Sequence, residues 1–231
     1  IVDFINAKDC FPQNSISGGV NYFLWEKAYH GPCNFTNILN QSKETAFRSL
    51  DEFEVFVRYN KAVNIIRKVN GSKNSITFGL STAIRGAEDP FDDCYKVISS
   101  KGIGYISKDE ITAGFDLVGK YKAMISRITY EHAGEPDKDG TLRVLSKIEV
   151  LAPNEVCTDS YITGGSFDSE KEAKNFVNYF KCKFTRFLLA QTLSSINLSK
   201  ERFVFIPMQD FSKPWTDEEL YAKYGLTDEE I

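Results

Sequence analysis

Apolar positions along the chain predict a fold with many short strands and few helices. The strongest periodicity lies in residues 169–193, where apolar side chains recur every three or four residues and form one face of an α-helix. We expect one long amphipathic helix here, capped by Asp168 or Ser169. A shorter helix is predicted over residues 60–69, followed by Gly71.

Shorter apolar runs bounded by polar loops predict the strands. They cover residues 1–5, 20–25, 33–39, 75–80, 94–99, 104–106, 121–130, 144–151, 156–163 and 203–207. The first two are apolar at nearly every position, which is typical of strands covered on both faces. Residues 54–58 are either a short strand or the lead-in to the next helix, and residues 131–141 are polar and predict a mobile loop. The fold class is therefore α+β.

The C-terminal segment carries two helix-opening patterns in succession. Residues 216–219 and 227–230 both have the Thr-x-x-Glu form of a capping box, and Gly225 suits the end of the first helix. The second pattern begins next to the end of the chain, and no Met precedes Ile1. We expect the chain to be part of a longer protein.

Cysteine usage and hydropathy favour a cytoplasmic protein. The five cysteines are widely spaced and form no Cys-x-x-Cys pair, which predicts free thiols and neither a zinc site nor a disulfide framework. No apolar run approaches the roughly 20 residues that span a bilayer, so no membrane partner is expected. A hydrophobic content of 42% is sufficient for a folded core.

Net charge neither proves nor excludes binding to nucleic acid. The formal net charge is −4, but residues 215–231 contain six acidic side chains and one basic side chain. The remainder of the chain is therefore close to neutral and can present a basic face to phosphates.

The loop between the first two predicted strands carries an aromatic residue, Phe11, followed by Pro12. An aromatic ring on such a loop can stack on a flat ligand such as a nucleobase, and Pro12 stiffens the loop. The alternative is that Phe11 packs in the core beneath the loop, as most aromatic side chains do.

Residues 1–27 resemble the last strands of the TaqI-type adenine DNA methylases, in which a Phe-Pro on this loop stacks on the flipped adenine. Further resemblance lies in residues 54–62, 121–127, 169–193 and 203–216, in that order. The resemblance implies a remnant of a Rossmann-like methyltransferase sheet in residues 1–30 and a mixed α/β target-recognition domain, truncated at its C-terminus, in residues 31–231. It also implies a restriction-modification enzyme that uses S-adenosylmethionine, binds double-stranded DNA and carries an upstream catalytic domain.

The family's catalytic Asn-Pro-Pro-Tyr occurs nowhere in this chain, and the glycine-rich cofactor loop is absent too. The chain alone is therefore expected to bind no cofactor and to methylate nothing, although the parent enzyme would transfer methyl groups to adenine. The family also includes fused endonucleases, so a nuclease in the parent is left open. Within this chain, Pro136-Asp137 with Glu172 and Lys174 resembles a nuclease metal site only superficially, because the last two lie on the predicted helix. We expect no metal.

Candidate DNA contacts cluster around the predicted loop at residues 131–141, because arginine can bond guanine and lysine suits phosphate. They are Lys122, Arg127, Tyr130, His132, Arg143 and Lys147. Arg85 and Lys96, which border another polar loop, are further candidates. An ordinary solvated face would show the same composition. Lys174, Lys181 and Arg186 are interpreted as surface charges of the long helix.

Two other classes of function remain open. One is a non-enzymatic specificity subunit that binds only DNA and partner proteins, although no internal repeat is present. The other is a protein-interaction domain without a DNA role, which the acidic C-terminal segment favours.

Overall fold

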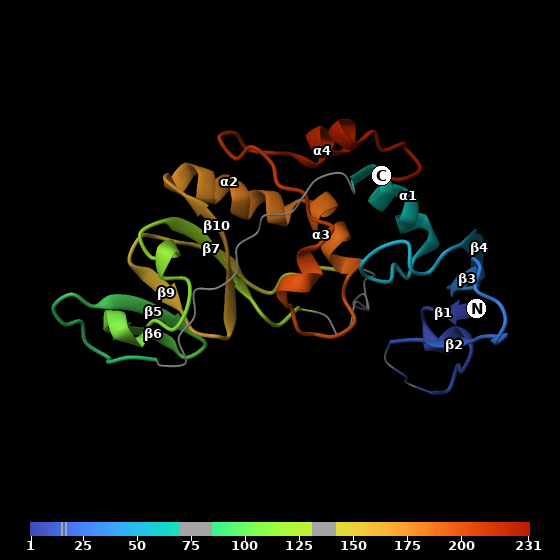
Figure 1. Ribbon diagram of the computed structural model, residues 1–231, viewed down its shortest axis with the longest axis horizontal. Coiled ribbons are helices and arrows are strands. Elements are labelled where there is room, and N and C mark those ends of the chain that lie inside the picture. The colour runs from blue at the N-terminus through green and yellow to red at the C-terminus, as the bar shows by residue number, and fades with distance from the viewer. Residues whose placement is uncertain (15, 17, 70–84, 131–141) are drawn as a thin grey trace.

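The computed structural model describes residues 1–14, 16, 18–69, 85–130 and 142–231. These residues form three small β-sheets and four α-helices that spread along the long axis of the molecule (Figure 1). The first sheet lies at one end, the sheet containing β5 and β6 lies at the other, and α2 and α3 lie between them. The predicted mixed α+β class is confirmed.

The first sheet has the strand order β2-β1-β3-β4. Its strands are β1 (Val2–Phe4), β2 (Val20–Tyr22), β3 (Cys33–Leu39) and β4 (Ser42–Arg48). Strand β1 pairs antiparallel with β2 and parallel with β3. Asn40 and Gln41 have φ values of 50° and 66° and form a two-residue turn between β3 and β4. The expected domain division after residue 30 falls between two strands of this one sheet.

A buried polar network joins the first sheet to α1 (Asn60–Val69). The Asn60 side chain donates to the Phe35 carbonyl at 2.8 Å and accepts from Arg48 Nε at 2.8 Å. The Asn37 side chain accepts the backbone N–H of Asn60 at 2.8 Å. These bonds satisfy polar groups at the helix start that would otherwise be buried without partners. The bounds of α1 match the prediction.

Two three-stranded sheets follow. The second has the order β10-β7-β8, and the third has the order β6-β5-β9. Their strands are β5 (Tyr95–Ser99), β6 (Gly102–Ile106), β7 (Tyr121–Ser126), β8 (Ile148–Leu151), β9 (Glu155–Cys157) and β10 (Tyr161–Phe167). The predicted strand 75–80 and the predicted loop 131–141 lie outside the described residues.

The strand predicted over residues 20–25 ends at Tyr22, and three later strand predictions were also wrong in extent. The single strand expected over residues 156–163 is divided between β9 and β10, which belong to different sheets, because the chain turns where the Tyr161 N–H bonds the Thr158 carbonyl at 3.1 Å. Strand β7 ends at Ser126, where its side chain accepts from the backbone N–H of Ile128 at 3.2 Å. Strand β8 begins later than expected, at Ile148.

The long helix expected over residues 169–193 is two helices, α2 (Glu170–Lys181) and α3 (Lys183–Ala190). Ser169 caps α2, as predicted, by accepting the Glu172 N–H. Cys182 between the helices is extended, with φ −60° and ψ 145°. The carboxylate of Asp217 accepts the first N–H groups of α3, from Lys183 at 3.0 Å and Phe184 at 2.9 Å. A distant side chain thus satisfies a helix start that has no local cap.

Asp217 belongs to α4 (Asp217–Tyr224), which has the capping box predicted from residues 216–219. Thr216 accepts the Glu219 N–H at 3.2 Å, and the Glu219 carboxylate accepts the Thr216 N–H at 3.0 Å. Gly225 ends the helix in the left-handed region with φ 60°, where a residue without Cβ is unstrained. Four short 3-10 helices complete the described elements: η1 (Ala7–Asp9), η2 (Lys108–Glu110), η3 (Phe115–Leu117) and η4 (Lys200–Phe203).

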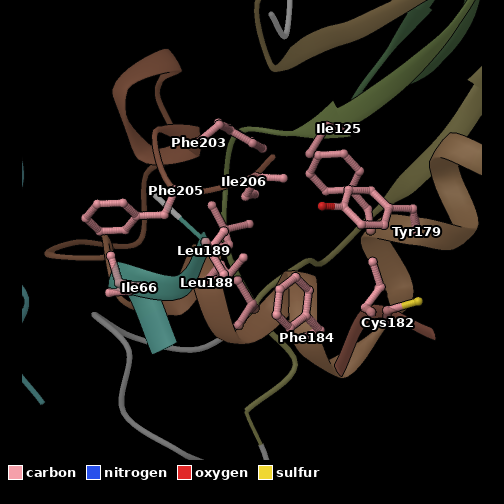
Figure 2. Close-up of a cluster of buried hydrophobic side chains, with 14 of the residues drawn as sticks. Ile66, Ile125, Tyr179, Cys182, Phe184, Leu188, Leu189, Phe203, Phe205 and Ile206 are labelled. Carbon is pink, nitrogen blue, oxygen red and sulfur yellow. The ribbon is translucent and has the colours of Figure 1, made fainter. Parts of the chain in front are cut away.

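One large core connects α1, β7, α2, α3 and the segment before α4. Figure 2 shows Ile66 of α1 beside Phe205, with Leu188 and Leu189 of α3 close by. Phe203, Phe205 and Ile206 are buried in this core, but residues 203–207 do not form the predicted strand. The Ile206 N–H bonds the Phe203 carbonyl at 3.0 Å, so the chain turns here and these apolar side chains fill the core from a turn.

The contact between Asp217 and α3 predicts that loss of the Asp217 side chain destabilises the fold more than loss of the neighbouring Glu218 side chain. Asp217→Ala should lower the free energy of unfolding by about 1–2 kcal/mol, because it removes the cap of α3. Glu218→Ala removes the same charge from the first turn of α4 but not the cap, and it should cost less than about 0.5 kcal/mol. Urea unfolding followed by circular dichroism measures both, and equal effects would contradict the capping role.

Candidate nucleic-acid interface

Phe11 lies on a turn that backbone hydrogen bonds hold on both sides. Its N–H donates to the Ala7 carbonyl at 2.7 Å, and its carbonyl accepts from Asn14 at 3.1 Å. The side chain is 46% exposed, and Pro12 is exposed beside it. The ring is therefore not a core residue, and it is presented on a fixed turn where a flat ligand can reach it.

The strand that follows this turn is more exposed than the sequence predicted. Tyr22 is 62% exposed, and Phe23, Leu24 and Trp25 are between 64% and 94% exposed. The prediction that β2 is covered on both faces is wrong for this structure, because β2 is an edge strand paired only with β1 among the described residues. We call Tyr22 to Trp25 the apolar strip; a run of this size on a surface is typical of a contact with another macromolecule.

Four of the candidate DNA contacts gather at one end of the β7–β8 hairpin. They are Arg127, Tyr130, Arg143 and Lys147, and all but the partly exposed Lys147 are exposed. Hydrogen bonds hold the two segments together, from the Ser126 N–H to the Lys147 carbonyl at 2.9 Å and from the Tyr130 N–H to the Val144 carbonyl at 3.3 Å. The Arg143 guanidinium lies 4.4 Å from the centre of the Tyr130 ring, a cation–π contact that orients both groups.

Lys122 is not part of this surface, although the sequence placed it there. It is fully buried, and its ammonium group donates to the carbonyls of Val118, Lys120 and Ala152 at 2.9–3.1 Å. Burial lowers the pKa of Lys122 to about 8, and the charge of Glu155 opposes this shift. Lys122 therefore holds a loop together and does not reach DNA.

Two of the other candidates do not join the group on the hairpin. Lys96 lies on β5 and forms an ion pair with Glu155 at 2.7 Å. Arg85 is exposed near β6, where the neighbouring Ala87 bridges to Tyr105. His132 lies outside the described residues.

Two basic side chains that the sequence assigned to an ordinary helix surface lie next to the hairpin group. Lys181 and Arg186 line the same hollow, of about 440 Å³, as Arg143 and Lys147. Lys181 ends α2 and Arg186 lies on α3, so the two residues stand on either side of the bend at Cys182. The single long helix predicted from the sequence gave no reason to expect these two side chains beside a hairpin more than 30 residues away in the chain.

The arrangement offers contacts to an aromatic or anionic ligand and no metal centre within the described part of the chain. No group of three or more His, Cys, Asp or Glu side chains there is placed to hold a metal ion. The two helix residues of the nuclease-like pattern have other partners, since Glu172 accepts from the Ser169 hydroxyl at 2.7 Å and Lys174 pairs with Glu170 at 2.8 Å. All five cysteines are free thiols. None of the helices in the described segments is long and apolar enough to cross a membrane.

Comparison with known proteins gives a short similarity to a methylase. No protein-family model matches the chain. A stretch of 28 residues is 50% identical to a Mycoplasma pneumoniae protein described as an uncharacterized adenine-specific methylase. The stretch covers 12% of this chain and only 7% of that methylase. The match indicates a relationship with methylases and is too short to define a recognition region.

The buried ammonium of Lys122 predicts a pH effect on stability. Its pKa is about 8 in the folded chain and about 10.4 in an unfolded one, so between these values the unfolded chain holds a proton that the folded chain has released. Stability should therefore rise with pH in this window, by about 1–2 kcal/mol between about pH 7.5 and 9.5. Lys122→Met should lack this gain, and urea unfolding of both proteins at the two pH values tests it. The same pH dependence in both would show that Lys122 does not titrate in this range.

Proposed function

We propose that this chain is the part of an adenine-specific DNA methyltransferase that binds the duplex and supports the extruded adenine. The observation that carries the proposal is Phe11, a half-exposed ring on a hydrogen-bonded turn. A methylase must take its target base out of the stack, and an aromatic face stabilises the extruded base by about 1–3 kcal/mol. The short similarity to an adenine-specific methylase supports the same class of enzyme.

Methyl transfer would need parts that this chain does not contain. The sequence has neither the Asn-Pro-Pro-Tyr motif nor the glycine-rich cofactor loop of the family that it resembles. S-adenosylmethionine would therefore bind to an upstream catalytic domain of the same restriction-modification enzyme. Residues 1–30 would contribute β1 and β2 to the sheet of that domain, and the parallel pairing of β1 with β3 would extend this sheet past residue 30. Residues 31–231 would carry target recognition.

The apolar strip favours a second candidate function, a protein-interaction domain without a DNA role. Tyr22, Phe23, Leu24 and Trp25 are all more than 60% exposed, and such a surface suits a protein partner better than a phosphate backbone. In the first proposal, the upstream catalytic domain covers the strip. In the second, another protein does so, and the basic hairpin group is an ordinary solvated face.

Salt-dependent binding to duplex DNA separates the two candidates. The chain should bind a labelled duplex, and the logarithm of its affinity should fall linearly with the logarithm of the KCl concentration, because phosphate contacts release counterions. Fluorescence anisotropy from about 50 to 300 mM KCl measures this slope. Absence of binding at the lowest salt concentration would remove the DNA proposal and leave the protein-interaction candidate.

The role of Phe11 predicts a loss of methylation without a loss of fold. In the complete enzyme, Phe11→Ala should reduce the rate of methyl incorporation into duplex DNA by about 5- to 150-fold, which corresponds to the lost stacking energy. The free energy of unfolding should change by less than about 0.5 kcal/mol, since the ring is half exposed. Phe47→Ala is the matched control, because Phe47 is a 65% exposed ring on β4. Equal methylation rates in the two variants would exclude base stacking by Phe11.

A further inference from the structure

The hollow between the β7–β8 hairpin and the bend at Cys182 concentrates positive charge. Its lining includes the four cations Arg143, Lys147, Lys181 and Arg186. Glu149 is the one acidic side chain in the described lining. The whole chain carries a formal net charge of −4, so this concentration is opposite in sign to the protein as a whole. We call this site the basic hollow.

Arg186 holds the two sides of the basic hollow together. Its Nε donates to the Lys181 carbonyl at 3.2 Å, and its Nη1 donates to the Leu142 carbonyl at 3.4 Å. The first bond caps the C-terminal end of α2, and the second reaches the segment that leads into the hairpin. The guanidinium is therefore fixed before any ligand arrives, which reduces the entropy lost on binding.

The two lysines of the basic hollow can respond to an incoming anion. Lys181 is exposed, and in the described part of the structure its ammonium group has no hydrogen bond or ion pair. Lys147 pairs with Glu149 at 3.1 Å, but their side chains are 40% and 57% exposed, so the pair contributes at most about 1 kcal/mol. A phosphate can replace Glu149 as the partner of Lys147 at little cost.

We propose that the basic hollow binds the phosphate backbone of duplex DNA and sets the orientation of the duplex on the protein. The inference rests on the proposed function and adds Lys181 and Arg186 to the interface. Arginine and lysine are the side chains that most often contact phosphate, and such contacts fix position without reading sequence. Arg127 and Tyr130, exposed on the same hairpin, then lie where they can meet the groove beside the anchored backbone.

The test compares lysines inside and outside the basic hollow. The variants are Lys147→Gln, Lys181→Gln and their combination. The control is Lys171→Gln, an exposed lysine in the first turn of α2, ten residues and about 15 Å along the helical rise from Lys181. Arg186 is left intact because it also holds two backbone carbonyls. Circular dichroism verifies that every variant keeps its fold.

Each single variant in the basic hollow should weaken duplex binding roughly 5- to 10-fold at about 100 mM KCl. The slope of the logarithm of affinity against the logarithm of KCl concentration should fall in magnitude by about one for each single variant and by about two for the combination. Lys171→Gln should leave the slope unchanged. If the wild-type chain binds DNA and the hollow variants lose no more affinity than Lys171→Gln does, the inference is overturned and the proposed function stays intact. Failure of the wild-type chain to bind duplex DNA would overturn the proposed function, and the inference with it. Displacement of DNA by inorganic phosphate beyond that caused by KCl of equal ionic strength would show a site for free phosphate and would also overturn the inference.

Discussion

The bend at Cys182 is the constraint on which the rest of the structure depends. A break inside a helix leaves carbonyl groups at one end and N–H groups at the next, and burial makes such groups costly without partners. Here Arg186 Nε donates to the Lys181 carbonyl at the end of α2, and the Asp217 carboxylate accepts the first N–H groups of α3. The bend is thus held by one local and one distant side chain, and it brings α4 against α3. The stacked rings of Phe184 and Tyr224, with centroids 5.1 Å apart, complete this contact.

The same bend lies at the basic hollow. Lys181 at the end of α2 and Arg186 on α3 stand on either side of it and line one hollow with Arg143 and Lys147. The Phe11 turn connects two strands of the first sheet. A buried bond of Asn60 and a partly buried bond of Arg58 join that sheet to α1 and the segment before it. Because α1 shares the large core with α2 and α3, the aromatic turn and the basic hollow are attached to one folded body. The proposed recognition role needs such a frame, since phosphate contacts and base contacts act together only when their spacing is fixed.

The sequence was sufficient where local patterns decide the structure. The α1 helix and the caps at Ser169 and Thr216 were predicted because each depends on residues within one or two turns. The break in the long helix was missed because Phe180, Phe184 and Leu188 keep the four-residue spacing across Cys182, and all three are buried. The group that stabilises the break, Asp217, lies more than 30 residues away. Residues 203–207 were apolar enough for a strand but fill the core from a turn.

In the candidate site, too, local sequence patterns were informative and contacts between distant segments were not predicted. The exposed ring of Phe11 agrees with one of the two interpretations that the sequence left open. Lys122 was misassigned, because an alternating strand pattern does not show that three carbonyls surround the ammonium group. Lys181 and Arg186 gained a place beside the hairpin only through the tertiary structure.

Hydrogen–deuterium exchange of the chain with and without duplex DNA tests the central claim most directly, because it locates the bound surface without prior choice of residues. The account predicts slower exchange in the presence of DNA in residues 142–149 and 181–187, which contain the cations of the basic hollow, and in residues 9–14 around Phe11. Unchanged exchange in all three segments at saturating DNA, or slower exchange confined to the apolar strip, would contradict it.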